Sequence, residues 1–290
     1  MTDAVAVFSE GTFEEQIQEL VNFLARGLGD EARAAYIRPF QDALLTPEGK
    51  TPLAQDPERR KKVIGMVREK VVGLGEGTER EIEGFFNLLI SHLVTLFSST
   101  LDLEPHVSAL VSTIAAAPET QSGIVYRVLS NLFNGLPRKS SLRRDVYLAL
   151  LKLASERGDL DVLQVERADV KRWTSEWEIS EEEIAAFLHT VAEAFRKAGD
   201  IETAYGYQLY YLFAVCTKSP QAVGASTQTI AWAVSEPSIF DLDSLLRTDT
   251  LEAVQDHPLY SLLKIFSSGD LAQYHTWESE HASTLAEFGK

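Results

Sequence analysis

Two runs of basic residues are the side chains of this sequence with the clearest capacity to bind a charged partner. The first, Arg59–Lys62, opens an expected helix, and the second, Arg138, Lys139, Arg143 and Arg144, lies in a loop and the helical turn after it. Guanidinium and ammonium groups pair with RNA phosphates or with the carboxylates of an acidic protein. A solvated helix face also produces such charge runs, so both interpretations stay open.

A glycine-rich segment, residues 73–77, superficially resembles a loop that holds phosphate. It follows an expected helix instead of a strand, and it has neither the lysine nor the Ser/Thr of a P-loop. We therefore predict an ordinary loop between two helices.

The other side chains with catalytic potential do not form a recognisable site. His275 and His281 lack the spacing of a metal-binding pair on one helix face. Cys216 lies in an apolar run with no basic neighbour closer than Lys218, which predicts a buried structural thiol. The acidic run Glu181–Glu183 falls in an expected first helical turn, where the helix dipole favours acids. We predict no catalytic residue, no cofactor and no metal, and hence no enzyme.

Two tryptophans lie one helical turn apart and share a face with Val170. This spacing of Trp173 and Trp177 predicts a buried interface between helices, and a stripe that binds a peptide is the alternative.

Short local signals mark where the expected helices begin and end. A Gly-Asp pair follows three of them, at Gly158-Asp159, Gly199-Asp200 and Gly269-Asp270. Such a glycine can adopt the left-handed conformation that closes a helix, and the aspartate can cap the next one. A Ser or Thr with Glu three residues later forms a capping box. These boxes begin at Thr12, Thr78 and Ser180.

The helical period of 3.6 residues dominates the chain, and strand-like alternation is almost absent. We expect Pro39 to kink or split a helix over residues 30–45, Pro105 and Pro118 to bracket another, and a last helix to run from Asp270 to Phe288. The predicted fold is all-α: a right-handed superhelical solenoid of antiparallel helix pairs, because each pair can bury its apolar face only against its neighbours.

Composition restricts the function further. The chain has 290 residues, 45% of them apolar, and a net charge of −16, so its overall charge does not draw it to nucleic acid or to an anionic membrane. A single cysteine permits no disulfide within the chain, which fits a reducing compartment. The first residues do not form a secretory signal, and no apolar stretch reaches the length of a membrane span.

Five segments occur in an order typical of one known family. They are Tyr126–Leu136, Leu142–Ala154, Val170–Trp177, Ser238–Leu246 and His257–Phe266. This series, with its Ser-Asn-Leu-Phe-x-Gly run and both tryptophans, resembles the family of m subunits of eukaryotic translation initiation factor 3. The resemblance covers residues 123–290 well and the first 120 weakly.

The resemblance implies a PCI module, in which helical repeats of the TPR or HEAT type precede a small winged-helix domain. It implies N-terminal helical repeats over residues 1–120 and the helical-repeat part of a PCI module over residues 121–290. Because nothing after Phe288 would supply the strands of a winged helix, we expect this chain to lack that domain.

The function implied by the resemblance is that of a non-catalytic scaffold in the cytoplasm. Its partners would be other PCI subunits and the metalloprotease-like MPN subunits of the factor, with the small ribosomal subunit and mRNA reached through the complex. No membrane and no small-molecule substrate is implied. A subunit resembling the seventh of the signalosome, or one of the proteasome lid, is an alternative, since one fold serves all three. A helical enzyme or small-molecule binder that uses His275, His281 or Glu183 is another.

Overall fold

The computed structural model describes residues 10–163 and 166–284, and these residues form helices and no strand. The α-helices are α1 (Phe13–Leu24), α2 (Asp30–Leu44), α3 (Pro57–Glu69), α4 (Glu79–Leu96), α5 (Thr100–Ala115), α6 (Ser122–Gly135), α7 (Leu142–Arg157), α8 (Arg167–Glu176), α9 (Glu181–Lys197), α10 (Ile201–Ala214), α11 (Gln221–Ser235), α12 (Leu242–Leu246), α13 (Pro258–Ser268) and α14 (Leu271–Glu280). Four short 3₁₀ segments join them: η1 (Leu53–Gln55), η2 (Glu119–Gln121), η3 (Leu160–Leu163) and η4 (Asp249–Val254). The prediction of an all-α helical solenoid is confirmed.

The chain divides into two compact units. The first consists of residues 1–157 with 175–178, and the second of residues 158–174 with 179–290. The expected division after residue 120 falls inside the first unit, where α4 packs on α6 and α5 packs on α7. The assignment of a PCI module to residues 121–290 therefore does not coincide with a packing boundary.

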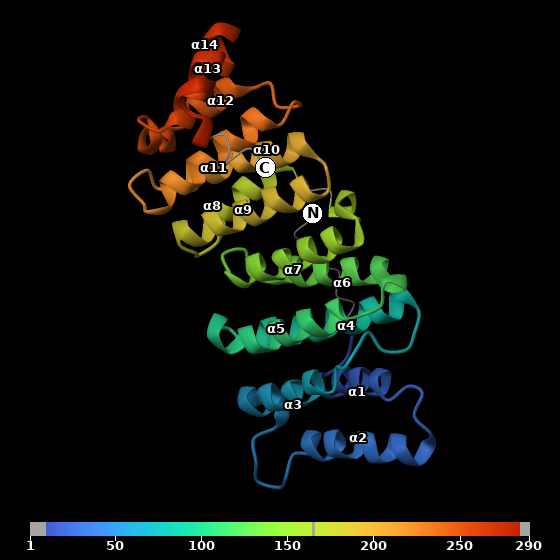
Figure 1. Ribbon diagram of the computed structural model, residues 1–290. Helices are drawn as coiled ribbons and strands as arrows, with labels where there is room; N and C mark the ends of the chain where they lie inside the picture. Colours follow the sequence, from blue (N-terminus) through green and yellow to red (C-terminus); the bar gives the residue numbers. More distant parts are fainter. Residues whose placement is uncertain (1–9, 164–165, 285–290) are drawn as a thin grey trace. The chain divides into compact units, whose positions relative to one another are not determined.

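Within the first unit, helical hairpins stack in layers (Figure 1). Helices α1 and α3 pack on α4 and α5 respectively, and α4 and α5 pack in turn on α6 and α7. Each layer thereby buries the apolar face of the next, as the solenoid argument requires. A polar contact fixes the register of one pair of layers: Asn131 of α6 donates to Glu83 and Asn87 of α4, both at 3.0 Å.

The second unit is built around α11. This helix packs on α10, η4 and α13, while α9 pairs closely with α10, and α13 packs on α12 and α14. Many of its buried residues are small or carry a hydroxyl group. They are Ala222, Ala225, Ser226, Thr227, Thr229, Ala231 and Ala233. Small side chains let neighbouring elements approach closely, and each hydroxyl needs an internal partner when it is buried.

The capping signals of the sequence act as predicted. Thr12, Thr78 and Ser180 each form a complete capping box with the glutamate three residues later. Asp200 and Asp270 cap α10 and α14 through their carboxylates, which accept the backbone N–H groups of Thr203 and Gln273. The helix starts are therefore set by contacts within four residues of the chain.

The glycine signals are confirmed at two of three positions. Gly158 and Gly199 adopt φ of +76° and +82°, the left-handed conformation expected of a helix end. Gly269 does not, because its φ is −90° and its ψ −174°. A Cβ on Gly269 would come within 2.8 Å of the backbone of Ile265, so a close approach explains this glycine instead.

The structure contradicts two of the proline expectations, a split of the helix at Pro39 and a helix start at Pro105, whereas Pro118 follows the end of α5 as expected. Helix α2 continues through Pro39 without a break, and α5 begins at Thr100, so Pro105 lies inside it. A helical proline leaves unpaired the carbonyl four residues earlier. Those carbonyls belong to Ala35 and Leu101, both exposed residues, so water can satisfy them at little cost. The expected helix from Asp270 to Phe288 is not continuous, because α14 ends at Glu280 and His281 leaves the helical conformation. Residues 285–288 of this expectation lie outside the described residues.

Candidate binding surfaces

The basic residues of the run 138–144 do not share one environment. Arg143 lies in the interior, and Arg138 and Lys139 lie at the surface. Arg143 is 1% exposed and lies on the apolar face of α7, next to Val146 and Tyr147. Its Nε donates to the carbonyl oxygen of Phe133 at 2.9 Å, and its guanidinium stacks 4.2 Å from the centre of the Phe133 ring. The expectation that Arg143 meets RNA or a partner is therefore wrong, because its charged group is used inside the first unit.

The other three cations of this run remain nearer to solvent. Arg138 and Lys139 are exposed, while the side chain of Arg144 is 19% exposed and pairs with Asp145 at 2.8 Å. The backbone carbonyl of Lys139 accepts from the N–H of Glu178 at 2.9 Å, which fixes the loop. The surface that this run offers to an anion thus consists of Arg138 and Lys139, with Arg144 at its edge.

The tryptophan pair lies in the interior. Trp173 and Trp177 are 1% and 4% exposed. Val170, one helical turn before Trp173, is fully buried. The indole of Trp177 meets the ring of Phe133 edge-on, with centroids 6.5 Å apart. In this position the two side chains pack against protein and offer no stripe to a peptide.

The first basic run, Arg59–Lys62, is also largely engaged by the chain itself. Arg59 donates to the carbonyl oxygens of Leu45 and Thr51 at 2.9 and 3.2 Å, and so ties down the loop before α3. Arg60 stacks 4.6 Å from the centre of the Phe13 ring. Lys61 pairs with Glu58 at 2.9 Å. These contacts favour the structural interpretation of this run.

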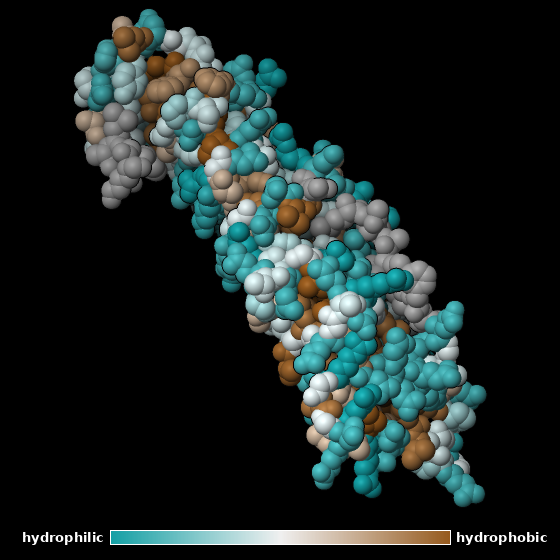
Figure 2. Space-filling model, turned by 90° about the vertical axis from the view of Figure 1, so that its right-hand side faces the viewer, coloured by the Kyte–Doolittle hydropathy of each residue, from teal (hydrophilic) through white to brown (hydrophobic). Residues whose placement is uncertain are grey.

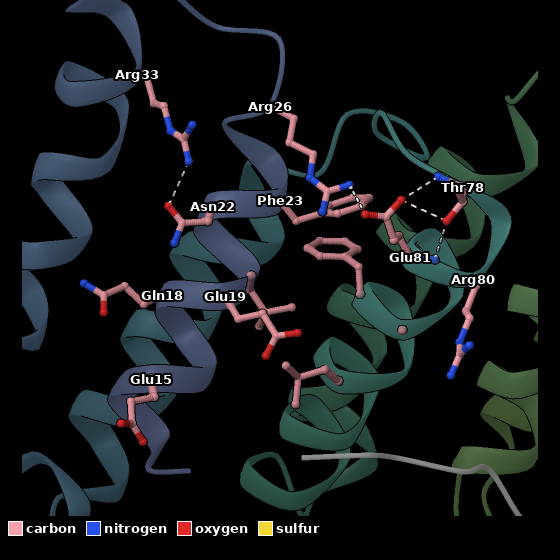
Figure 3. Close-up of a pocket in the computed structure, with 14 residues that line it drawn as sticks. Glu15, Gln18, Glu19, Asn22, Phe23, Arg26, Arg33, Thr78, Arg80 and Glu81 are labelled. Carbon is pink, nitrogen blue, oxygen red and sulfur yellow. Dashed lines mark hydrogen bonds and ion pairs between the residues drawn. The ribbon is translucent and has the colours of Figure 1, made fainter. Parts of the chain in front are cut away.

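A polar pocket of about 830 Å³ opens between α1, α2 and the start of α4 (Figure 3). Its base includes Phe23 and Phe85, whose rings stack with centroids 4.6 Å apart. Arg26 lies over Phe23 at 4.8 Å and pairs with Glu81 at 2.9 Å, while Arg33 approaches Asn22 at 3.4 Å. The pocket thus contains both basic and acidic side chains, and the charges of Arg26 and Glu81 neutralise each other.

The carboxylate of Glu81 illustrates why this pocket is poorly suited to acid–base chemistry. It accepts the backbone N–H and the hydroxyl of Thr78, both at 2.8 Å, and these bonds, followed by the bond to Arg26, lower its pKa. A carboxylate held in this way stays ionised and occupied as a helix cap. Gly75 in the adjacent loop has φ of +80°, and a Cβ there would overlap Phe23. The glycine-rich segment therefore serves packing between helices.

The histidines and the cysteine do not assemble into a reactive centre. His275 lies 3.4 Å from Glu278 on its own helix, and His281 packs on Trp277. Within the described residues, no three His, Cys, Asp or Glu side chains lie close enough to hold a metal ion. Cys216 is exposed, so the prediction of a buried thiol was wrong. The reason is that α10 ends at Ala214, and the chain turns before the cysteine reaches the apolar face.

Membrane insertion has no support from the helices of residues 10–163 and 166–284, since none combines the length and the apolar character of a span. The described residues thus define a helical-repeat protein.

Comparison with known proteins identifies its relatives. No protein-family model matches the chain. It is 27% identical over 294 residues to eukaryotic translation initiation factor 3 subunit M of Phaeosphaeria nodorum, a match that covers 98% of this chain and 64% of that protein. The subunits M of Emericella nidulans and Chaetomium globosum are 28% and 27% identical and match 93% and 95% of the chain. The chain spans about three fifths of the length of these curated relatives.

The resemblance inferred from the sequence is confirmed: the chain is similar to curated subunits M of initiation factor 3. The similarity also reaches further than the ordered segments indicated, because matches over 93–98% of the chain include most of its first 120 residues.

Proposed function

We propose that this chain is the helical part of a non-catalytic scaffold subunit of eukaryotic translation initiation factor 3. In this role it binds other PCI and MPN subunits of the factor and supports assembly of initiation complexes on the small ribosomal subunit, in the cytoplasm. The observation that carries the proposal is the similarity to curated subunits M over almost the whole chain. Residues 121–290 would then form the helical repeats of its PCI module.

The chemistry of the described residues supports binding over catalysis. In the pocket between α1, α2 and α4, the carboxylate of Glu81 is engaged in a helix cap and an ion pair with Arg26. The basic runs are partly consumed by internal contacts, as Arg143 and Arg59 show. What remains is a stack of helices that presents extended surfaces, which suits a scaffold.

The test is capture of partners from a eukaryotic lysate by the tagged chain, with mass spectrometry of what is retained. We expect subunits of initiation factor 3, in stoichiometric amounts and stable to moderate salt. Recovery of signalosome or proteasome-lid subunits without initiation-factor subunits would overturn the proposal in favour of those PCI assemblies. A destabilised variant such as Trp173→Ala, which removes a buried indole, should lose the partners and so shows that capture depends on the fold.

A further inference from the structure

A groove in the second unit combines three cations with an apolar floor. It lies between α8, α10 and the end of α12 and has a volume of about 660 Å³. Its basic side chains are Arg167 and Lys171, one turn apart on α8, and Arg247 just after α12. All three residues are exposed, and none of the described residues that line the groove is acidic.

The floor of the groove comes from one helix and is fixed in place. Leu209, Tyr210 and Phe213 line it from α10. The hydroxyl of Tyr210 lies 3.0 Å from that of Thr174 on α8, so this ring is held before any partner arrives. Phe213 is 61% exposed. The face in Figure 2 is mostly hydrophilic, with hydrophobic residues in separate patches. Phe213 is one of the large hydrophobic side chains that the second unit exposes, and it lies beside cations.

These cations form no salt bridge within the described residues, although acids are abundant in the chain. At longer range the charge of Arg247, after the hydrogen bonds from Ser244, lowers the pKa of Asp241. Asp and Glu outnumber Lys and Arg by 43 to 27. In the described part of the chain, no carboxylate lies within 4 Å of the charged nitrogens of Arg167, Lys171 or Arg247. On neighbouring surfaces the usual arrangement is a local pair, such as Arg172 with Asp169 at 2.9 Å.

The position of Arg167 depends on a glycine. Its guanidinium lies against Gly206 of α10, and a Cβ at that position would come within 2.8 Å of the Arg167 Cζ. Gly206 is buried in mid-helix, where glycine is less favourable than alanine. The open side of this glycine thus gives the arginine its place at the wall of the groove.

We propose that this groove docks a short acidic peptide segment of another protein, with an aromatic or aliphatic side chain set between its carboxylates. The carboxylates pair with Arg167, Lys171 and Arg247, and the apolar side chain covers Phe213 and Leu209. The proposal rests on the proposed scaffold function only in taking the occupant to be part of another protein.

A nucleic acid fits this groove less well, although it is also anionic. A strand extends beyond a single groove, and the same elements carry exposed acids, Glu202 on α10 and Asp243 on α12. With a net charge of −16, the chain repels a long polyanion outside the groove. A short peptide confines its charge to the three cations.

The proposal can be tested with a defined probe. This is a fluorescein-labelled peptide in which aspartate alternates with phenylalanine, measured by fluorescence anisotropy against the whole chain at low and moderate salt. The double variant Lys171→Glu with Arg247→Glu should bind it about tenfold or more weakly, and binding by the native chain should fall with salt. Gly206→Ala changes no charge but displaces Arg167, so we expect about a two- to fivefold loss.

A matched control is Lys197→Glu with Lys218→Glu, which makes the same change of charge on exposed residues of the same unit that do not line the groove. It should bind the probe like the native chain. Equal losses in both double variants, or none in either, would overturn the proposal, as would oligouridylate that binds the groove more tightly than the peptide. If the chain captures initiation-factor subunits but does not bind the peptide, only the proposal of the groove is refuted. A chain that binds the peptide but captures no initiation-factor subunit refutes only the proposed function.

Discussion

The two units of this chain place charge in opposite ways. The first unit buries two ionisable side chains, Arg143 at 1% exposure and His92 at 8%. The buried polar side chains described in the second unit are neutral. They are Thr174, Gln208, Ser226, Thr227, Thr229, Thr248 and Thr250. The second unit keeps its cations at the surface, where three of them surround a groove.

This difference shows that a basic residue in the sequence can belong either to the interior or to a binding surface. A buried guanidinium is stabilising only where ring faces and carbonyls replace its water, as Phe133 does for Arg143. Buried hydroxyls meet the same requirement with local acceptors. Gln208 donates to Thr229 at 2.6 Å, and Thr229 donates to the carbonyl of Ala225 at 2.8 Å. The units should therefore respond differently to substitution and to pH.

The largest effect is expected from Arg143→Ala. It removes a buried side chain, leaves a cavity beside Phe133 and deprives a buried carbonyl of its donor, which should lower the free energy of unfolding by about 3 to 5 kcal/mol. Urea denaturation followed by circular dichroism measures the change. Lys152→Ala in the same helix is the control, since its exposed side chain pairs with Glu156 at 3.9 Å and its removal should cost less than about 1 kcal/mol. Equal losses in the two variants would place the charge of Arg143 at the surface after all.

The second effect is a loss of stability in acid that arises in the first unit. Burial, with a smaller contribution from the charge of Arg60, lowers the pKa of His92 to about 4. Between about pH 6.5 and pH 4, His92 is protonated in the unfolded chain but stays neutral in the folded chain. The free energy of unfolding therefore falls as the pH falls through this window. By pH 4.5 the loss should be about 2 to 3 kcal/mol.

His92→Leu should remove most of this acid sensitivity, because leucine does not titrate. The measurement is the difference in unfolding free energy between pH 7 and pH 4.5 for each protein. His275→Leu serves as the control, since His275 is exposed in α14 and its replacement should leave the acid loss intact. An unchanged pH dependence in the His92 variant would assign the acid loss to other groups.

A smaller effect tests the neutral interior of the second unit. The hydroxyl of Thr250 donates to the carbonyl of Leu212 at 2.6 Å, in the last turn of α10. Thr250→Val keeps the shape but removes the hydroxyl donor of that carbonyl, which then keeps only the backbone N–H of Val215 at 3.3 Å, so we expect a loss of about 1 kcal/mol with no new pH dependence. Thr190→Val, at an exposed site, should change stability by less than about 0.5 kcal/mol. Thermal denaturation at two pH values distinguishes these outcomes.

The smallest effect on stability is expected at the exposed part of the 138–144 run. Arg138→Glu with Lys139→Glu should leave unfolding within about 0.5 kcal/mol of the native chain. If this surface meets RNA, the slope of log affinity against log salt should fall by up to about 2 units. Lys50→Glu with Lys152→Glu provides equal charge changes elsewhere in the first unit. If filter binding gives the same RNA affinity and salt dependence for both double variants, the run 138–144 has a purely structural role.

Local chemistry made much of the fold predictable. The capping boxes at Thr12, Thr78 and Ser180 depend on two side chains one turn apart, so the sequence contains the whole interaction. The wrong expectations concern features that depend on distant neighbours or on solvent. Pro105 is tolerated because its orphaned carbonyl faces water, and Gly269 is required by a close backbone approach instead of by a left-handed turn.

The candidate sites were harder to predict, for a related reason. Arg143 looked like part of a charge run, but its spacing from Val146, Tyr147 and Leu150 puts it on the buried stripe of α7, and that periodicity was the available signal. The groove had no signal of this kind. Arg167 and Arg247 are far apart in the sequence, and only the packing of α8, α10 and α12 brings them to one surface.

The capping boxes have one further consequence. Each fixes the first turn of its helix from within, through a side chain and a backbone N–H that need no other element. Thr78 and Glu81 thus set the first residue of α4 by themselves, while the loop before it, residues 70–77, contributes packing of its own through Gly75 and Leu74. The start of the helix and the packing of the loop therefore depend on different residues, and a substitution can change one without the other.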